Sequence, residues 1–220
     1  QGEPIAPLSV LEGKVAKRAT GTTVRFWPEA KYFDSPKFAL KALKHNLKAK
    51  AVLAAGLKII YDDRINNEKI EWQFENGLVD YLMDELEGRE ILPDPAFVSS
   101  GQAERAACEF AICWNVEGGE QIEESYVNLI PTAQGGTHVN GLRSGVTEAL
   151  REFCELRNLL PRNMKLSAED VWDGVNFILS LKFQEPQFSG QTKERLSSRE
   201  ASNIVLNIAK DAFALWLNQH

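Results

Sequence analysis

The stretch F-S-G-Q-T-K-E-R-L-S-S-R-E, residues 188–200, lies between an apolar run at 175–183 and an amphipathic stretch that begins near Ser198. The apolar run predicts a buried β-strand, and the apolar residues of the later stretch recur at helical spacing. Gly190 allows the backbone between them to turn, because glycine has no side chain to clash. We therefore expect a strand, a polar loop and a long helix, in that order.

Gln191 and Lys193 are the two side chains of this loop that suit chemistry on an anion. Glutamine offers amide donors, and lysine offers a mobile ammonium group. Such a pair suits a phosphate whose negative charge grows during its transfer to water. A solvated loop with an ordinary surface lysine explains the same residues, because exposed lysines are common. The residues alone leave both interpretations open.

Composition limits the classes of protein to which the chain can belong. It has 220 residues, of which 44% are hydrophobic, enough for one sizeable core or two small ones. The net charge of -6 means that any contact with DNA would need a local basic patch. No apolar run is long enough to span a bilayer, and the polar start at 1–9 does not resemble a signal peptide. We expect a cytoplasmic protein without a membrane partner.

The cysteines and histidines give no pattern of metal ligands. Cys108, Cys113 and Cys154 leave one thiol over in any disulfide scheme, which is typical of a reducing cytosol. Cys108 and Cys113 have no second pair to complete a four-ligand site, so we expect no metal. Cys113 and Cys154 lie in apolar segments, and we expect both to be buried structural thiols. His138 is a candidate general base, but no Ser or Cys nucleophile arrangement surrounds it, which favours a structural hydrogen bond.

Apolar periodicity and turn residues predict the remaining elements. The expected helices are one from Ser35–Pro36 to Gly56, then 78–86, 139–157, a short turn opened by a Ser167–Asp170 capping box, and a last helix from about Ser198. The expected strands are 13–19, 22–27, 57–61, 69–74, 105–115, 125–130 and 175–183, with a proline-broken loop at 92–95. This mixture predicts an α/β or α+β fold with helices packed on a sheet.

Two local patterns have more than one interpretation. Lys37, Lys41, Lys44 and Lys48 recur at helical spacing. Such a stripe is usually the wet face of an amphipathic helix, but clustered charge is also all that nonspecific contact with DNA phosphates requires. The pair Gly135–Gly136 before a helix resembles an anion-binding turn. No lysine follows it at the spacing of a P-loop, so we do not expect that motif.

Four stretches, in the expected order, resemble the ATPase subunits of type IIA DNA topoisomerases, which belong to the GHKL family. They are TGTTVRFWPE (20–29), SYVNLIPTAQGGTHVNGLR (125–143), QFSGQTKERLSSRE (187–200) and AKDAFALWLNQ (209–219). The segments NLIPTAQGGTH, REFCELRNLLPR and LSAEDVWDG resemble the B subunit of topoisomerase IV more than the B subunit of gyrase. The resemblance extends over nearly the whole chain.

This resemblance implies a division into two parts. Residues 1–29 would be the C-terminal remnant of a GHKL ATP-binding domain, whose last strands include 22–27 and end at Pro28. Residues 30–220 would be the transducer domain. The transducer of this family resembles domain 2 of ribosomal protein S5 and contains a left-handed βαβ crossover, which is opposite to the usual hand.

The resemblance also implies roles for particular residues. Thr22 would lie near the adenine ring of ATP, and Gln191 and Lys193 would contact its γ-phosphate. Arg143 would line a DNA-sized cavity between two such domains. A strand former at Thr22 and a surface arginine at 143 remain the alternatives. ATP and Mg²⁺ would be the cofactors of the full protein, with the metal ligands in the missing ATP-binding domain.

The function that follows from the resemblance is the coupling of ATP binding and hydrolysis to DNA strand passage. The full enzyme would relax and decatenate DNA during chromosome segregation, in the cytoplasm at the nucleoid. Its partners would be DNA, the A subunit of topoisomerase IV and a second copy of this protein. The family's catalytic glutamate, magnesium-binding asparagine and glycine-rich lid are absent from this sequence, so we expect no ATP hydrolysis by the chain alone. The alternatives are a gyrase B transducer, a noncatalytic S5-like nucleic-acid-binding module and another GHKL protein.

Overall fold

The computed structural model describes residues 6–10, 13, 16 and 20–220. The chain divides into two compact units, residues 1–39 and 40–220, and each is described by itself. Among the described residues of the first unit, the only helix or strand is the 3₁₀ helix η1 (Ala30–Tyr32). The rings of Phe26 and Phe38 meet edge to face in this unit, with centroids 5.9 Å apart.

The strand expected at 22–27 is not formed, and this prediction was wrong. A strand needs a neighbour to accept and donate its backbone hydrogen bonds, and no described residue pairs with this segment. The strand expected at 13–19 lies mostly outside the described residues. β-branched content alone therefore did not decide the conformation of this part of the chain.

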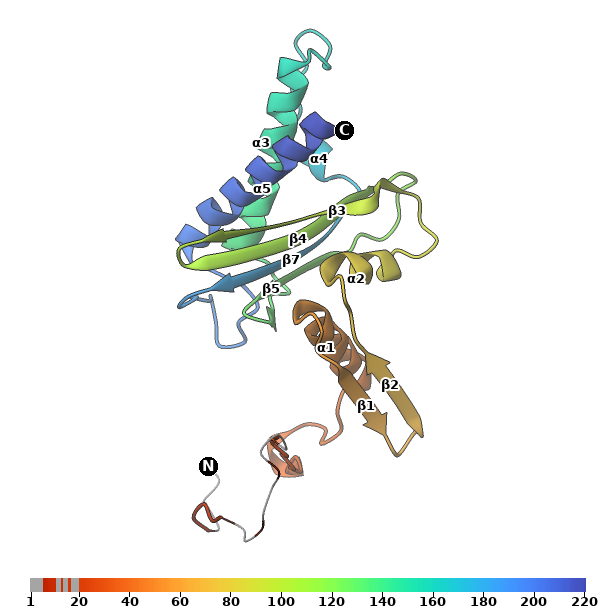
Figure 1. The fold of residues 1–220 in the computed structure, drawn as a ribbon, viewed down its shortest axis with the longest axis vertical. Helices are drawn as coiled ribbons and strands as arrows, with labels where there is room; N and C mark the ends of the chain where they lie inside the picture. Colours follow the sequence, from red (N-terminus) through yellow and green to blue (C-terminus); the bar gives the residue numbers. More distant parts are fainter. Residues whose placement is uncertain (1–5, 11–12, 14–15, 17–19) are drawn as a thin grey trace. The chain divides into compact units, whose positions relative to one another are not determined.

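The second unit is built on a five-stranded sheet in the order β3-β4-β7-β5-β6. Figure 1 labels β3, β4, β7 and β5 of this sheet. The strands are β3 (Ile91–Ala103), β4 (Ala106–Asn115), β5 (Glu123–Val127), β6 (Ile130–Pro131) and β7 (Val175–Phe183). All neighbouring pairs are antiparallel except β5 and β7, which run parallel. The connection from β5 to β7 passes through the two helices α3 (Thr137–Leu156) and α4 (Ala168–Trp172).

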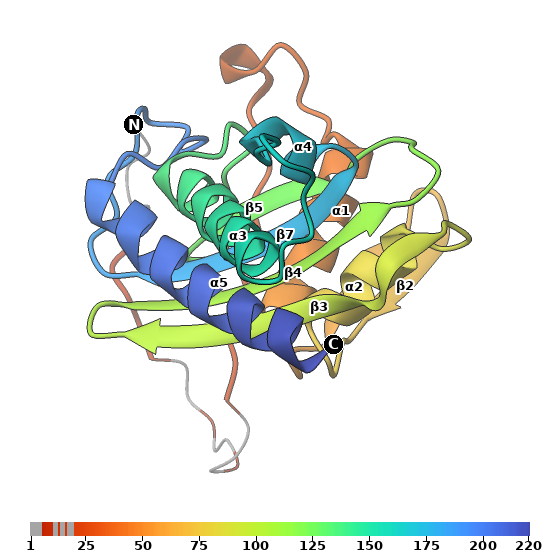
Figure 2. The ribbon, with the colours of Figure 1, turned by 90° about the horizontal axis from the view of Figure 1, so that it is seen from above.

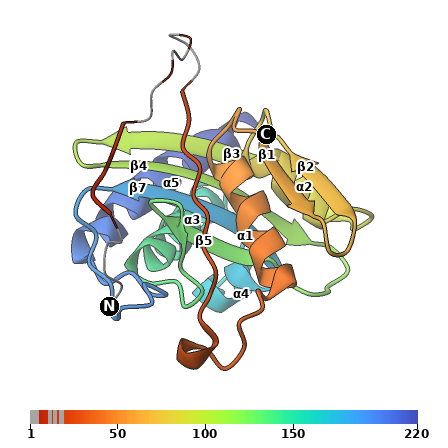
Figure 3. The ribbon, with the colours of Figure 1, turned by 90° about the horizontal axis from the view of Figure 1, so that it is seen from below.

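Helices cover the sheet on both faces. The helices α3 and α5 (Arg199–Gln219) lie over one face, as seen from above in Figure 2. The helix α1 (Leu40–Leu53) lies on the opposite face, as seen from below in Figure 3, together with α2 (Leu78–Glu85). The hairpin of β1 (Ile59–Asp63) and β2 (Glu68–Trp72) forms a separate two-stranded sheet between α1 and α2 in the sequence. No helix in the described part of the chain is long and apolar enough to cross a membrane.

The central strands are apolar on both sides because each side faces a core. Phe110 and Ile112 of β4 belong to the core under α3 and α5, whereas Ala111 and Cys113 belong to the core under α1 and α2. Side chains alternate between the faces of a strand, so one run of apolar residues supplies both cores. Burial raises the pKa of the Cys113 thiol to about 11, and that of the Cys108 thiol to about 12. Cys113 is a buried, unpaired thiol, as predicted, whereas Cys154 is only partly buried, so the prediction for Cys154 was wrong.

Most predicted boundaries differ by one to three residues, and the strand predicted at 125–130 is divided into β5 and β6. Two larger differences lie at α1 and β3. The helix α1 begins at Leu40 rather than at Ser35–Pro36, because the Ser35 hydroxyl accepts a hydrogen bond from the amide of Lys37 in a local bend. The segment 92–95 is part of β3 rather than a loop, and its register with β4 shifts between Leu92 and Phe97. Proline lacks an N–H but is tolerated on an edge strand such as β3.

Other local predictions are confirmed. The strand β7 has the predicted bounds, and the β1–β2 hairpin turns at Asn67, whose φ is 53°. The Ser167–Asp170 capping box opens α4, with the Ser167 hydroxyl accepting from the Asp170 amide at 3.1 Å. Each of these features depends on residues that are neighbours in the sequence.

The helices α3 and α5 approach each other closely because α3 presents glycine at the crossing. A Cβ atom at Gly141 would lie 2.3 Å from the carbonyl oxygen of Ser202, and one at Gly145 would lie 2.5 Å from that of Leu206. Lys210 then bridges from α5 to two carboxylates of α3. The two helices are therefore expected to move together.

Candidate functional site

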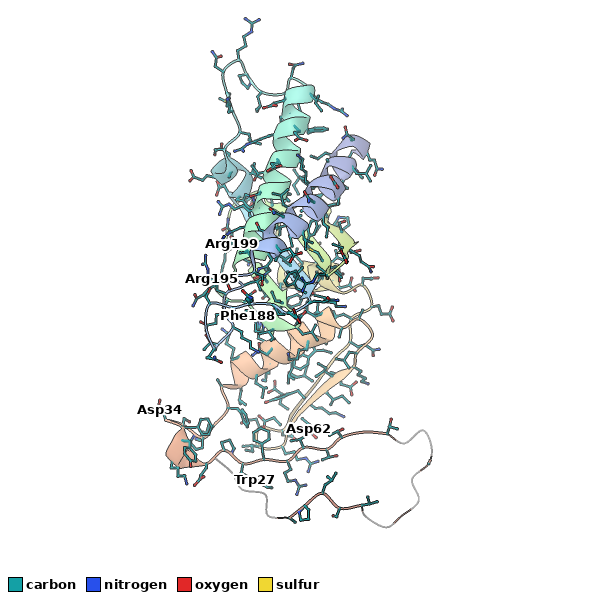
Figure 4. All side chains as sticks on the ribbon, turned by 90° about the vertical axis from the view of Figure 1, so that its left-hand side faces the viewer. Trp27, Asp34, Asp62, Phe188, Arg195 and Arg199 are labelled. Carbon is teal, nitrogen blue, oxygen red and sulfur yellow. The ribbon has the colours of Figure 1, made fainter. Side chains whose placement is uncertain are left out.

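The candidate site is the β7–α5 loop, residues 184–198, whose two sides form a narrow hairpin. Phe188 and Leu196 pair in antiparallel fashion, and the Ser189 amide donates to the Arg195 carbonyl at 3.0 Å. Figure 4 labels Phe188 and Arg195 on these two sides. The tip, residues 190–193, closes with the Lys193 amide donating to the Gly190 carbonyl at 3.2 Å.

The lower part of the loop is anchored in the core. Leu196 is buried, and Phe188 packs against the same cluster of apolar residues beneath α3 and α5. At the base, the Arg105 guanidinium lies 3.4 Å from the Glu185 carboxylate and 3.9 Å from that of Glu200. Arg105, at the β3–β4 turn, thus links the start of the loop to the start of α5.

A second segment is hydrogen-bonded to this hairpin, with one parallel bridge between Gly136 and Leu196. We call residues 132–136, directly before α3, the leader. The Leu196 amide donates to the Gly135 carbonyl at 3.0 Å, and the Thr137 amide donates to the Leu196 carbonyl at 3.1 Å. The Gln134 amide donates to the Glu194 carbonyl at 2.9 Å. The loop and the beginning of α3 are therefore one hydrogen-bonded structure.

Gly136 is the point of closest contact between leader and loop. Its φ is 134°, and a Cβ atom there would lie 2.3 Å from the carbonyl oxygen of Leu196. Only glycine fits both restrictions. The glycine pair at 135–136 resembles an anion-binding turn in the sequence. In the structure it instead contacts the β7–α5 loop, because the Thr137 amide donates its hydrogen bond to the Leu196 carbonyl.

His138 lies behind the leader in a buried polar cluster. Its Nε2 is 3.1 Å from the Thr132 hydroxyl, which in turn donates to the Ser125 carbonyl at 2.8 Å. Burial lowers the pKa of His138 to about 4, so the ring is neutral at physiological pH. Its Nδ1 has no hydrogen-bond partner among the described residues. The predicted structural hydrogen bond is thus present, and the ring is closed off from solvent.

The tip presents its functional groups to solvent. Gln191, Thr192 and Lys193 are all exposed, and neither Gln191 nor Lys193 has a side-chain hydrogen bond or ion pair with another described residue. Lys193 has a φ of 59°, which is uncommon for a residue with a side chain. A free ammonium and a free amide on a well-anchored turn can bind an anion without breaking an existing contact.

The other residues singled out in the sequence lie elsewhere. Arg143 is exposed on α3, with its guanidinium 5.7 Å from the centre of the Trp172 ring. Thr22 is exposed in the first unit, which is described by itself. Within the second unit, Gln191 and Lys193 share one local structure, the tip of the β7–α5 loop.

Two of the four lysines of the predicted stripe, Lys44 and Lys48, are paired with carboxylates, whereas Lys37 lies before the first residue of α1. Lys44 lies 2.5 Å from the Glu68 carboxylate, and Lys48 lies 2.7 Å from Asp84 and 2.6 Å from Glu85. The hydrogen bond that Lys44 donates to the Glu68 carboxylate raises the pKa of Lys44. These lysines join α1 to β2 and α2, which weakens the interpretation of the stripe as a DNA contact.

Sequence reasoning missed the side-chain contacts that Gln134, Glu194 and Arg105 make at the loop. The Gln134 side chain donates from Nε2 to Glu194 Oε2 at 2.9 Å, although the two residues are 60 positions apart. The sequence does mark the two segments, since Gln134 precedes the glycine pair and Glu194 follows Lys193. No periodicity connects the two positions, so only the fold reveals the pair.

Comparison with known sequences gives consistent matches. A family model described as DNA gyrase B matches residues 77–220. The DNA topoisomerase 4 B subunit of Pseudomonas aeruginosa is 59% identical over 208 residues, covering 94% of this chain and 33% of that protein. The Escherichia coli K12 protein of the same name is 53% identical, and the match covers 100% of this chain and 35% of that protein. The DNA gyrase B subunit of Thermotoga maritima is 31% identical. The chain thus spans about a third of these relatives, 33–35%.

Solved structures agree with the fold. The topoisomerase IV ATP binding domain of Francisella tularensis, in complex with a small-molecule inhibitor, aligns with a TM-score of 0.75 and 41% identity, covering 89% of this chain and 52% of that one. The 43K ATPase domain of Thermus thermophilus gyrase B, in complex with an aminocoumarin, aligns with a TM-score of 0.73 over 87% of this chain and 52% of that one. At 24% identity, the second match supports the mixed α/β fold alone.

Proposed function

This chain belongs to the DNA gyrase B family, with topoisomerase IV B subunits among its near relatives, and from that premise we propose that its β7–α5 loop senses the terminal phosphate of ATP. The two relatives named topoisomerase 4 are 53–59% identical and the gyrase relative is 31% identical, so the chain is part of a type II topoisomerase subunit of the topoisomerase IV kind. The activity of that whole subunit is part of the proposal.

One observation carries the proposal: the side chains of Gln191 and Lys193 are unengaged at the tip of a loop whose base is held firmly. In this proposal the Lys193 ammonium and the Gln191 amide donate to phosphate oxygens, which suits a group that gains negative charge in the transition state. When bound, ATP supplies the phosphoryl group whose presence or absence the loop detects. The donor set fits a phosphate, since both side chains offer N–H groups.

The magnesium ion of the full protein would be held outside this chain. No group of three His, Cys, Asp or Glu residues in the described part of the chain is arranged to hold a metal. The exposed tip has an amide and an ammonium, which are poor ligands for Mg²⁺ compared with carboxylates. We therefore assign Mg²⁺ and the main ATP-binding surface to the rest of the protein, and we expect the chain alone to be inactive.

The loop is joined mechanically to the helices that would carry the signal. Contact at the tip alters a hairpin that shares hydrogen bonds with the leader of α3 and leads directly into α5. Because α3 and α5 cross at Gly141 and Gly145 with backbone contact, the two helices respond as one body. A ligand shifts such an equilibrium only if it binds the two states differently, and the phosphate contact provides that difference.

The finer features of the family complete the proposal. The second unit would have the S5-like transducer fold, with a left-handed crossover between β5 and β7. Thr22 would lie near the adenine, and Arg143 would face DNA in a cavity between two copies of the protein. The partners would be DNA, the A subunit of topoisomerase IV and a second copy of this protein, at the nucleoid. The activity would be ATP-dependent relaxation and decatenation, and decatenation without supercoiling by the full enzyme would distinguish it from gyrase.

The test is Lys193→Ala in the full-length protein. Loss of a preorganised donor at a developing charge typically lowers turnover on the order of 100- to 1,000-fold. Steady-state ATP hydrolysis measures this effect. Lys182→Ala is the matched control, because Lys182 is also exposed but lies within β7, before the loop. Unchanged hydrolysis in Lys193→Ala, or an equal loss in the control, contradicts the proposal.

A further inference from the structure

The acid beside Lys193 is held by a specific partner. Glu194 directly follows Lys193, and its carboxylate accepts a hydrogen bond from Gln134 Nε2 at 2.9 Å. The backbone of Gln134 bonds the same residue, since its amide donates to the Glu194 carbonyl at 2.9 Å. Gln134 thus holds Glu194 through both its main chain and its side chain.

This arrangement matters because a free carboxylate is the natural competitor for an exposed ammonium. Exposed ion pairs between lysine and glutamate typically contribute about 0.2–1 kcal/mol. Among the described residues Glu194 forms no ion pair, and neither does Lys193. The carboxylate nearest in sequence is therefore engaged by a neutral amide instead of by the lysine at the tip of the loop.

We propose that Gln134 and Glu194 are positioning residues that form a latch, in which Gln134 keeps the Glu194 carboxylate away from Lys193 and leaves the ammonium free for a phosphate. This inference rests on the proposed role of Lys193 in contacting ATP. The latch also joins the tip of the loop to the leader of α3 by a side-chain contact, in addition to the backbone ladder.

Substitutions at residue 134 separate a role in charge from a role in structure. In the full-length protein, Gln134→Leu removes the amide and releases the carboxylate, and we expect kcat/KM for ATP to fall by about 1.5- to 5-fold, which corresponds to the energy of an exposed ion pair. Gln134→Glu places a second carboxylate opposite Glu194 and should lower kcat/KM further. Both positions are exposed, so the variants are expected to fold.

The decisive variant is the double substitution Gln134→Leu with Glu194→Gln. A neutral amide at 194 cannot pair with the ammonium, so kcat/KM should return to near the wild-type value. If the latch served only to support the loop, the double variant would remain at least as impaired as Gln134→Leu. Gln184→Leu is the matched control, because Gln184 is an exposed glutamine at the base of the loop whose side chain makes no hydrogen bond to another described residue.

The outcomes separate this inference from the proposed function. Unchanged kcat/KM in Gln134→Leu, or no recovery in the double variant, overturns the latch when Lys193→Ala is still impaired. Unchanged hydrolysis in Lys193→Ala overturns the proposed function itself. Impairment in Lys193→Ala and Gln134→Leu, with recovery on adding Glu194→Gln, supports both.

Discussion

The two faces of the central sheet are covered in different ways. On one face, which we call the dry face, α3 and α5 meet through backbone contact at Gly141 and Gly145, over an apolar core (Figure 2). The other, which we call the polar face, carries α1 and α2 over a second apolar core (Figure 3). There the Glu124 carboxylate of β5 accepts hydrogen bonds from the hydroxyls of Tyr81 at 3.1 Å and Tyr126 at 2.5 Å. Close packing tolerates little change, whereas two hydroxyls share one carboxylate on the polar face, so that one donor remains when the other is removed.

The candidate site is attached to the dry face of the sheet and not to the polar face. Both helices of the dry face begin at that site, because α3 follows the leader and α5 follows the β7–α5 loop. Aromatic stacking adds to the dry face, where the rings of Phe97, Phe213 and Trp216 lie with centroids 5.3–5.6 Å apart. A displacement of the loop therefore reaches a closely packed pair of helices directly, while neither helix of the polar face begins at the loop or its leader.

The largest expected effect is on the glycine crossing. Gly141→Val would push a side chain against the Ser202 carbonyl, which must move because it is backbone. We expect the free energy of unfolding to fall by about 3–4 kcal/mol, at the upper end for overpacking. Urea unfolding followed by tryptophan fluorescence measures it. Ser144→Val, at an exposed position of α3, is the control and should change stability by less than about 1 kcal/mol. Similar losses in both variants would show that the close approach is unimportant.

Acid should destabilise the dry face through His138. The pKa of its ring is lowered from 6.5 to about 4 in the folded chain, so the unfolded chain binds more protons between these values. Stability is therefore complete above pH 6.5 and falls as the pH drops towards 4, by roughly 3 kcal/mol at about 1.36 kcal/mol for each pH unit.

Urea unfolding at several pH values tests this prediction, with His138→Gln as the comparison. The variant should lose much less stability between pH 6.5 and 4. The lowered pKa of Asp63, about 2 and caused mainly by its hydrogen bonds from Asn66, acts only at lower pH, below the unperturbed value of 3.8. An identical pH profile for the two proteins over that interval would exclude His138 as the cause.

The smallest effect is expected on the polar face. Tyr126→Phe removes one hydroxyl donor from Glu124 but leaves that of Tyr81. A hydrogen bond to a charged group typically contributes about 1.5–3 kcal/mol, and the remaining donor should limit the loss to about 1.5 kcal/mol. The free energy of urea unfolding measures it, with Tyr32→Phe, in the first unit and largely exposed, as the control. A loss as large as that of Gly141→Val would mean that the two faces do not differ as proposed.

Much of the fold was predictable because its signals are local. The apolar run of β7, the Asn67 turn and the Ser167–Asp170 capping box each involve residues close in the sequence, and each appears as expected. The candidate loop was also recognisable, since Gly190 and the polar residues after it mark a turn between a strand and a helix.

Where the prediction failed, the outcome depended on a neighbour distant in the sequence. The segment 22–27 has the composition of a strand but finds no partner among the described residues. The segment 92–95 contains prolines that suggest a loop, yet it continues β3 because an edge strand needs hydrogen bonds on one side only. The composition of a segment limits the conformations it can adopt, and the segments packed beside it in the fold determine which of them it adopts.

The sequence by itself determined the order of most elements in the second unit and the identity of the residues at the tip of the loop. Tertiary structure alone decided that Gly136 lies against the Leu196 backbone and that the Gln134 side chain donates a hydrogen bond to Glu194. The physical reason is the separation of the interacting residues along the chain. Turns, caps and alternation follow from adjacent residues. Hydrogen bonds between positions 60 apart form only after the sheet has brought the two segments together.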